Sequence, residues 1–336
     1  MIHALPAPAP NPSVVARSFA AFLSDPQGGG SLYWRTPEWV TFRPAPKGLA
    51  TPFVQRRGAQ YYGPPTRSVV RNAFAARPDA YSELWARTQD PAMILLGRAR
   101  GRTAKLKSTR INGRAALRGS FALAPNRCAG LKRGTETVWL DRSTLLPLRI
   151  TEKRSASATT TIEYRAINTP IPPPIFLPPA ATTRPTRLNQ GFIRTTPAIA
   201  DKRVPFAASL PTRLPAGFTL SVSGWAPRSA RTGAEASNPR YRSLFAAVYR
   251  RGWEHIDVTQ RLAGAKGWLG DPFGFECGAE TSSTIDVEGA KATFGQGGEI
   301  VPHLYWRSGR VLYTVSGPFP APTLAAVARS LKPVGG

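Results

Sequence analysis

Short runs in which hydrophobic and polar residues alternate predict β-strands along much of the chain. Between residues 103 and 166 this alternation gives four expected strands, at 115–123, 135–140, 146–151 and 160–165. Asn112-Gly113, ahead of the first of them, is a hairpin signal because both residue types adopt positive φ readily. Consecutive strands with short links predict an antiparallel sheet with one buried and one solvated face.

Two segments of the first half have helical spacing instead. Apolar residues recur at intervals of three and four over residues 14–23, and a second helical stretch is expected over 81–96. The two short aromatic runs 31–34 and 39–42 are expected strands. The first half therefore combines a sheet with short helices.

A proline-rich run at 168–189 separates the two halves, because such a sequence is extended and stiff and cannot form a central strand. The second half predicts hairpins around Arg251-Gly252 and Ser308-Gly309, short strands within 284–294, and a final helix from Pro322. Leu324, Val327, Ala328 and Leu331 share one face of that helix, which we expect to cover the sheet.

These patterns divide the chain into four expected parts. They are a flexible Ala/Pro tail at 1–12, a first domain at 13–180, a linker at 181–205 and a second domain at 206–333. The length of 336 residues is enough for two domains of ordinary size. The 34 prolines and 30 glycines suit many short strands joined by tight turns.

The charge of the chain points to anionic partners. The formal net charge is +26, and no acidic residue lies between Asp90 and Glu136. Such a field attracts nucleic acid, anionic lipid headgroups or acidic wall polymers, although Arg-rich composition alone also produces it. The candidate residues for an anion-binding surface are Arg98, Arg100, Arg102, Lys105, Lys107, Arg110, Arg114 and Arg118.

Cysteines and termini bear on the cellular compartment. Cys128 and Cys277 match no metal motif, and either form an inter-domain disulfide or remain separate thiols. Residues 1–12 have neither the basic nor the apolar region of a signal peptide. Either the protein is cytoplasmic, or a leader or anchor is not present in this chain. The Ala/Pro run reads as the flexible tail that follows such a leader.

A family resemblance appears in the first half. Val138-Trp139-Leu140-Asp141, followed by 144–150, resembles the strand, turn and strand of the LolA/LolB lipoprotein-carrier superfamily. Leu145 stands where glycine is usual in that family, so the turn is expected to differ. Ile175-Phe176-Leu177-Pro178-Pro179 resembles the closing segment of the family, and the likeness covers roughly 90–180.

The second half resembles the carboxy-terminal domain of the RseB/MucB stress sensors. The segments that carry this resemblance are 214–218, 303–306, 313–317 and 324–331, and the order of the two halves matches as well.

Together the resemblances imply a mainly β (α+β) fold. Its first domain is a half-open antiparallel β-barrel of LolA type with a helical lid, and its second is a smaller antiparallel sheet closed by a C-terminal helix. They imply an extracytoplasmic protein of the periplasm, cell wall or membrane surface. An acyl lipid or lipoprotein is the expected ligand, and an anti-sigma factor or other membrane protein is the expected partner.

An acyl chain is held by apolar contact alone, so this role requires no cofactor and no catalytic group. The candidate wall residues of the lipid cavity are Trp34, Trp39, Phe121, Trp139, Ile150, Ile162 and Tyr164. Each of these positions also fits an ordinary hydrophobic core.

Catalysis and metal binding find little support in the sequence. The three histidines are His3, His255 and His303, and no metalloprotease, serine-hydrolase or C-x-x-C motif is present. His255 and Asp257 share one face of an expected strand, which suits a hydrogen-bonded pair rather than a metal site. We expect no enzyme, no metal and no cofactor.

Three functions stay open at this point. The first is lipid or lipoprotein binding, as a carrier or an envelope-stress sensor. The second uses the same fold with a collapsed cavity, as a protein-interaction module that regulates a membrane anti-sigma factor. The third is nucleic-acid binding, but residues 98–118 hold few aromatic residues and no recognised signature.

Overall fold

The structure, a computed structural model, describes part of the chain. The described residues are 18–24, 30–35, 38–44, 50–56, 59–62, 68–71, 96–97, 100, 106–123, 125, 132–155, 159–176, 186–188, 193–226, 244–252, 254–262, 281–297 and 300–335. Most of 30–71 is described by its backbone alone. The expected tail at 1–12, Cys128 and Cys277 lie outside these residues.

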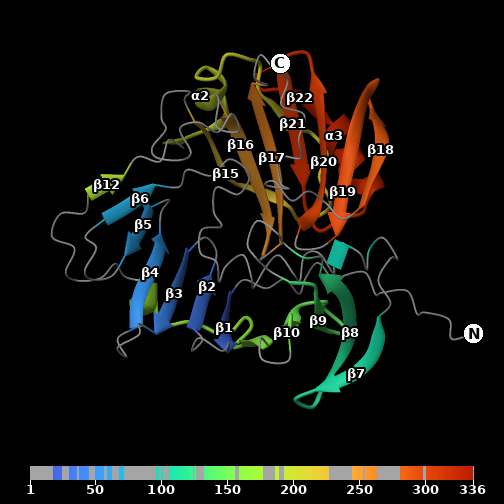
Figure 1. The fold of residues 1–336 in the computed structure, drawn as a ribbon. Coiled ribbons are helices and arrows are strands. Elements are labelled where there is room, and N and C mark those ends of the chain that lie inside the picture. Colours follow the sequence, from blue (N-terminus) through green and yellow to red (C-terminus); the bar gives the residue numbers. More distant parts are fainter. Residues whose placement is uncertain are drawn as a thin grey trace, which may run out of the picture.

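A 12-stranded sheet forms the first half (Figure 1). Its strands are β1 (Ser18–Ser24), β2 (Gly30–Arg35), β3 (Glu38–Pro44), β4 (Ala50–Arg56), β5 (Ala59–Tyr62), β6 (Ser68–Arg71), β7 (Lys107–Ile111), β8 (Arg114–Leu123), β9 (Gly134–Asp141), β10 (Pro147–Lys153), β11 (Thr159–Arg165) and β12 (Thr186–Leu188). They lie in the order β12-β6-β5-β4-β3-β2-β1-β11-β10-β9-β8-β7. Neighbours are antiparallel except β12 and β6. In the described part of the chain the sheet is open at β7 and β12. Because the other neighbouring strands are all antiparallel, the expected mainly β, antiparallel class is confirmed.

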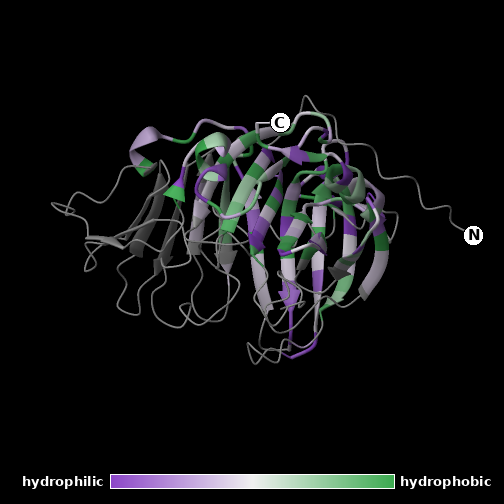
Figure 2. Cartoon of the chain, turned by 90° about the horizontal axis from the view of Figure 1, so that it is seen from above, coloured by the Kyte–Doolittle hydropathy of each residue, from purple (hydrophilic) through white to green (hydrophobic). Residues whose placement is uncertain are grey.

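An 8-stranded antiparallel sheet forms the second half. Its strands are β13 (Ile193–Arg194), β15 (Thr219–Ala226), β16 (Leu244–Arg251), β17 (Glu254–Leu262), β18 (Thr281–Val287), β19 (Ala290–Gly297), β20 (Ile300–Ser308) and β21 (Val311–Ser316). Their order is β13-β15-β16-β17-β21-β20-β19-β18. The short strands β14 (Ser209–Pro211) and β22 (Leu331–Pro333) pair separately. Hydrophobic and hydrophilic positions alternate along many of these strands (Figure 2).

The hairpins lie where the turn residues predict them. Asn112 and Gly113 have φ of 50° and 77° between β7 and β8, which are paired up to Ile111 and Arg114. Gly252 and Gly309, each with positive φ, lie in the turns β16–β17 and β20–β21. The four strands expected within 103–166 are β8 to β11, in consecutive antiparallel pairs.

The C-terminal helix α3 (Ala321–Arg329) covers the second sheet, as expected. Leu324, Ala325, Val327 and Ala328 are buried on it. They join one core cluster with residues of β16, β17, β20 and β21. The prediction placed Leu331 on this helix as well, but Leu331 begins β22 and pairs with Pro211.

The helix expected over 14–23 is wrong for its described part, because Ser18–Ser24 is the strand β1. This strand pairs with β2 on one side and β11 on the other, and these two ladders satisfy its backbone. Phe19 and Ala21 point to one buried face. Such tertiary pairing overrides a short helical spacing. The second expected helical stretch, at 81–96, lies outside the described residues except for Leu96. Leu96, Gly97 and Arg100 are helical.

The change from one sheet to the other falls between Leu188 and Ile193. This position lies inside the segment expected as a linker, which also contains α2 (Pro197–Asp201). Thr196 caps α2, since its Oγ1 accepts a hydrogen bond from the Ile199 backbone N–H at 3.4 Å. In the described part of the chain, no helix has the length and hydropathy that crossing a membrane requires.

We predict that Gly113→Ala destabilises the protein by about 1 kcal/mol, because a Cβ at φ of 77° is disfavoured. A Cβ at this position meets no atom within 4 Å, so the cost is purely conformational. Urea unfolding measures it. Gly113→Asn is the matched control and should cost less, since asparagine tolerates this region. Equal stability of Gly113→Ala and the parent would contradict the turn described here.

Candidate functional site

Four of the seven predicted wall residues come together on one face of the 12-stranded sheet, which we call the inner face. Phe121, Ile150, Ile162 and Tyr164 are 2–7% exposed and belong to one apolar cluster. Val138, Ile150 and Ile162 are direct cross-strand partners on β9, β10 and β11. The inner face is therefore a continuous apolar surface across several strands.

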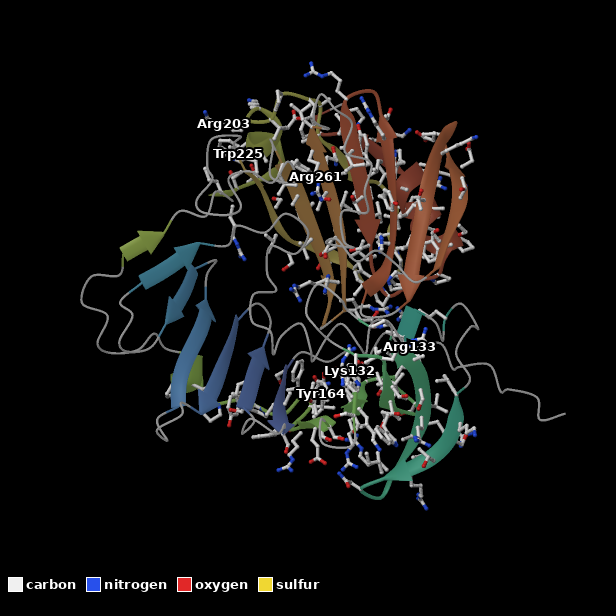
Figure 3. All side chains as sticks on the ribbon, in the orientation of Figure 1. Lys132, Arg133, Tyr164, Arg203, Trp225 and Arg261 are labelled. Carbon is white, nitrogen blue, oxygen red and sulfur yellow. The ribbon has the colours of Figure 1, made fainter. Side chains whose placement is uncertain are left out.

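Two residues from outside this sheet complete the inner-face cluster in the described part of the chain. They are Leu96, which is helical, and Val301 on β20 of the second sheet. Within the cluster, the Tyr164 ring lies 5.2 Å from that of Phe19 at an interplanar angle of 59°. The inner face thus looks toward the 8-stranded sheet, and the cluster joins the two halves. Figure 3 labels Tyr164 in the lower of the two sheets.

Only the backbone is described for the predicted wall residues Trp34 and Trp39. Trp34 is the cross-strand partner of Phe19 on one side and of Trp39 on the other. Both tryptophans therefore continue the strand-register row that begins at Phe19.

Charged side chains lie toward one end of the inner face, and the sequence interpretation missed them. Glu136 is 3% exposed and is the cross-strand partner of Phe121 and Glu152. Arg154 hydrogen-bonds Glu152 through Nε and donates from Nη1 to the Lys132 carbonyl at 2.6 Å. The available signal was the two-residue spacing of Glu136, Val138 and Leu140, which puts all three on the same face of β9. The apolar surface therefore has a polar boundary.

Trp139 lies on the opposite face, which we call the outer face, away from the other predicted wall residues. It packs near Ile111, Ala116 and Leu148. The Arg118 and Arg149 guanidinium carbons lie over the indole, 5.5 and 5.9 Å from its centroid. Strand alternation explains this, because the flanking residues Val138 and Leu140 point inward. The structure does not bring Trp139 to the inner-face cluster.

The predicted anion-binding residues do not form one group. Lys107, Arg114 and Arg118 are exposed, and their register places them on the outer face with Trp139. Arg110 is exposed on β7, at a register position of the other face. Arg98, Arg102 and Lys105 lie outside the described residues.

The prediction that Arg100 belongs to an exposed anionic-ligand surface is wrong. Its side chain is 12% exposed and forms an ion pair with Glu254, from Nη2 to Oε2 at 2.9 Å. Nη1 donates to the Pro318 carbonyl at 2.8 Å, and the guanidinium lies 4.4 Å from the centre of the Phe319 ring. Burial lowers the pKa of Arg100, while Glu254 opposes the shift. Glu254, 154 residues further along the chain, thus takes the place of water as a hydrogen-bond partner of the buried Arg100 guanidinium.

Arg251 completes the same contact from the other side. It donates two hydrogen bonds to Glu254, at 3.0 and 2.9 Å, and lies 5.0 Å from the centre of the Phe218 ring. The Phe218 and Phe319 rings meet edge to face at 5.7 Å. We call Arg100, Glu254 and Arg251 the latch, because they join the helical residue 100, which lies between β6 and β7 in the chain, to the second sheet.

A tight turn follows the strand that resembles the lipoprotein carriers. Asp141 Oδ1 accepts hydrogen bonds from the backbone N–H and the hydroxyl of both Ser143 and Thr144, at 2.7–3.1 Å. Burial opposes ionisation of Asp141, but these four hydrogen bonds outweigh it and hold the pKa of the carboxyl below its ordinary value.

Leu145 in this turn has φ of 59°, in the left-handed region that glycine favours. The turn thus keeps a glycine-type backbone despite the leucine. The Leu145 side chain is 2% exposed in the inner-face cluster. Burial of a leucine contributes about 1.5–3 kcal/mol, which offsets a conformational cost of about 1–2 kcal/mol.

Polar side chains are also buried on one face of the second sheet. His255 Nδ1 lies 3.0 Å from Asp257 Oδ1, so the expected pair is confirmed. Both residues are at most 3% exposed, and His303 is fully buried with Nδ1 2.9 Å from the Val301 carbonyl. Among the described residues, no three His, Cys, Asp or Glu side chains are grouped to hold a metal ion. This burial favours a structural role.

Comparison with known proteins yields structural neighbours alone. No protein-family model and no curated protein matches the chain. The complex of Pseudomonas aeruginosa MucA and MucB matches at 16% identity and a TM-score of 0.30, over 95% of this chain and 94% of that chain. A crystal structure of MucB matches at 15% identity and a TM-score of 0.30, over 95% of this chain and 93% of that chain.

The lipoprotein LppX of Mycobacterium tuberculosis matches 47% of this chain and 89% of that chain, at 11% identity and a TM-score of 0.32. Superpositions at these TM-scores are too loose to carry an argument about this chain. We therefore infer its function from its own residues and their geometry.

We predict that Arg100→Ala lowers the free energy of unfolding by about 2–3 kcal/mol. Glu254 loses one of its two cationic partners and the Pro318 carbonyl loses its donor, both in a buried setting. Arg114→Ala is the control, because Arg114 is 60% exposed and should change stability by less than about 0.5 kcal/mol. Chemical denaturation compares the two, and equal effects would exclude a stabilising latch.

We predict a pH-dependent difference between the parent and Asp141→Asn. A carboxyl whose pKa is depressed on folding stabilises above its unfolded pKa, about 3.9, and loses this contribution as pH falls through the folded value. The parent should be more stable by about 1–2 kcal/mol near pH 7, and the difference should shrink below about pH 4. Unfolding curves from pH 7 to 3 test this, and a difference that is constant with pH would contradict it.

Proposed function

We propose that this protein is a non-enzymatic, extracytoplasmic binding protein that holds an acyl chain of a lipid or lipoprotein on the inner face of the 12-stranded sheet. The observation that supports this most directly is the continuous apolar cluster between the two sheets. It includes Phe121, Ile150, Ile162 and Tyr164 on three different strands.

Apolar contact supplies enough energy for such a role. Each buried methylene contributes about 0.8 kcal/mol, so a chain of about 14 carbons contributes on the order of 10 kcal/mol before the costs of binding. The polar boundary near Glu136 and Arg154 suits the headgroup end of a lipid, because charged groups keep their hydrogen bonds there. No cofactor takes part in this proposal.

Ligand entry requires a movement of the cover. The wall residues are buried by the chain itself, so an acyl chain has to replace protein side chains. Among the described members of the cluster, Leu96 and Val301 are the contributions from outside the sheet. Displacing Leu96 also requires movement of the nearby Arg100 contact with Glu254, and Val301 belongs to a paired strand of the second sheet.

A protein-interaction module is the second candidate function, and the tight burial of the same residues favours it. Members of the inner-face cluster are at most 8% exposed. In that case the inner face is a permanent core, and the protein acts through a protein partner such as a membrane-bound anti-sigma factor. Bound lipid distinguishes the two functions.

We predict that the purified protein retains close to one acyl lipid per chain after a wash at about 1 M salt. The wash reduces the Debye length to about 3 Å and so removes lipid that is held only by surface charge. Lipid extraction followed by mass spectrometry measures the ratio. Lipid-free protein would exclude acyl binding in the isolated state and favour the interaction module.

Two neighbouring positions on β11 give a matched comparison. Ile162 is 3% exposed on the inner face, while Thr161 is half-buried on the outer face. Ile162→Asp should abolish lipid retention and Thr161→Asp should preserve it. Ile162→Ala, which places no charge inside, should lower retention in a chain that remains folded. Circular dichroism checks the fold of each variant, and equal retention in all three would contradict an inner-face site.

A further inference from the structure

The outer face of the 12-stranded sheet is basic and aromatic, and the proposed acyl binding does not use it. Among the residues whose side chains the structure describes, strand register places six bases there, all exposed or half-buried: Lys107, Arg114, Arg118, Arg149, Lys153 and Arg165. Figure 3 shows many nitrogen-tipped side chains below the green strands, on the side away from the second sheet. This face therefore presents positive charge to solvent.

One row of direct cross-strand partners crosses six strands of this face. The row runs Lys107, Arg118, Trp139, Arg149, Glu163 and Phe22, on β7, β8, β9, β10, β11 and β1. With strands about 4.8 Å apart, it spans roughly 24 Å. Arg114 and Lys153 extend the charge along the strands. The positive charge thus spreads in two directions over a broad surface.

The aromatic rings of the row are paired with arginines. Trp139 has Arg118 over it from β8 and Arg149 from β10, at 5.5 and 5.9 Å from the ring centre. Phe22 has Arg165 over it at 5.0 Å. Both rings are half-buried. Cation–π contact keeps these guanidinium groups near the rings, while Arg118 and Arg165 stay exposed to solvent.

The one acid of the row offsets only part of its positive charge. Glu163 accepts hydrogen bonds from Arg165, at 2.9 Å, and from Arg149, and these bonds keep the pKa of its carboxyl below the ordinary value. Asp141, on the same face, accepts hydrogen bonds from Ser143 and Thr144 and forms an ion pair with Arg114 at 3.6 Å. Among the described side chains of this face, six bases outnumber two acids, so their balance stays positive.

We propose that the outer face is a docking surface for a membrane rich in anionic phospholipid headgroups. Charge complementarity over a broad area is the reason, since arginine binds phosphate oxygens with two parallel hydrogen bonds. An indole with a polar N–H is favoured at the level of the headgroups. The site involves residues distinct from those of the acyl site, so either proposal can fail without the other.

Single-stranded nucleic acid fits this face less well. Its sequence-tolerant binding relies on aromatic faces on which bases stack. The arginines over Trp139 and Phe22 compete for those faces. A membrane plane needs no open ring face and matches charge that is spread in two dimensions.

The test is vesicle co-sedimentation of the full chain, with vesicles of about 30% phosphatidylglycerol in phosphatidylcholine at about 0.1 M salt. The outer-face variant carries Lys107→Gln, Arg118→Gln and Arg165→Gln. The matched control carries Arg203→Gln, Arg310→Gln and Lys332→Gln, three exposed residues of the second half with the same loss of charge. Substitution of exposed charges should leave both variants folded.

Each basic side chain near an anionic surface contributes about a fivefold gain in partitioning, so the outer-face variant should bind about a hundredfold more weakly. The control should fall much less. Equal losses in the two variants would overturn the proposal in favour of non-specific attraction by net charge. Absence of binding to these vesicles would also overturn it, and tight binding of a single-stranded oligonucleotide that the outer-face variant loses would then assign the surface to nucleic acid.

Discussion

Successive side chains of a β-strand point to opposite faces, so each strand of the first sheet has to serve two environments at once. On β9, Val138 and Leu140 enter the apolar cluster while Trp139, between them, meets arginines on the other side. The same division separates Ile162 from Glu163 on β11. A register slip of one residue would exchange the two faces, which fixes the register strongly.

The residues between β6 and β7 meet the second sheet through contacts of different character. Apolar packing through Leu96 and Val301 has no preferred direction, whereas the latch of Arg100, Glu254 and Arg251 requires a specific geometry. Gly97 adds close backbone approach, since a Cβ there would lie 2.7 Å from the Pro302 ring. The apolar contacts thus bury surface, while the buried charges require one relative orientation of the groups that they join.

Local signals predicted local structure well. Asn112-Gly113 and the alternation from 115 to 165 indicated β8 to β11, and the expected final helix is α3. The helix expected over 14–23 was wrong for residues 18–24 because β1 pairs with β11, about 140 residues away, and no local spacing reveals this pairing. The prediction that Arg100 is an exposed anion-binding residue was wrong for the same reason, since its partner Glu254 lies 154 residues further along the chain. Trp139 was grouped by its motif, although alternation with Val138 already placed it on the other face.

The open edge at β7 has a consequence for self-association. This strand has five residues, and in the described part of the chain only β8 pairs with it, so its outer backbone groups form a template for another strand. Lys107 and Arg110 are exposed on it. A second copy that docked here edge to edge would bring lysine and arginine against lysine and arginine. Repulsion between like charges therefore opposes the growth of the sheet beyond a single chain.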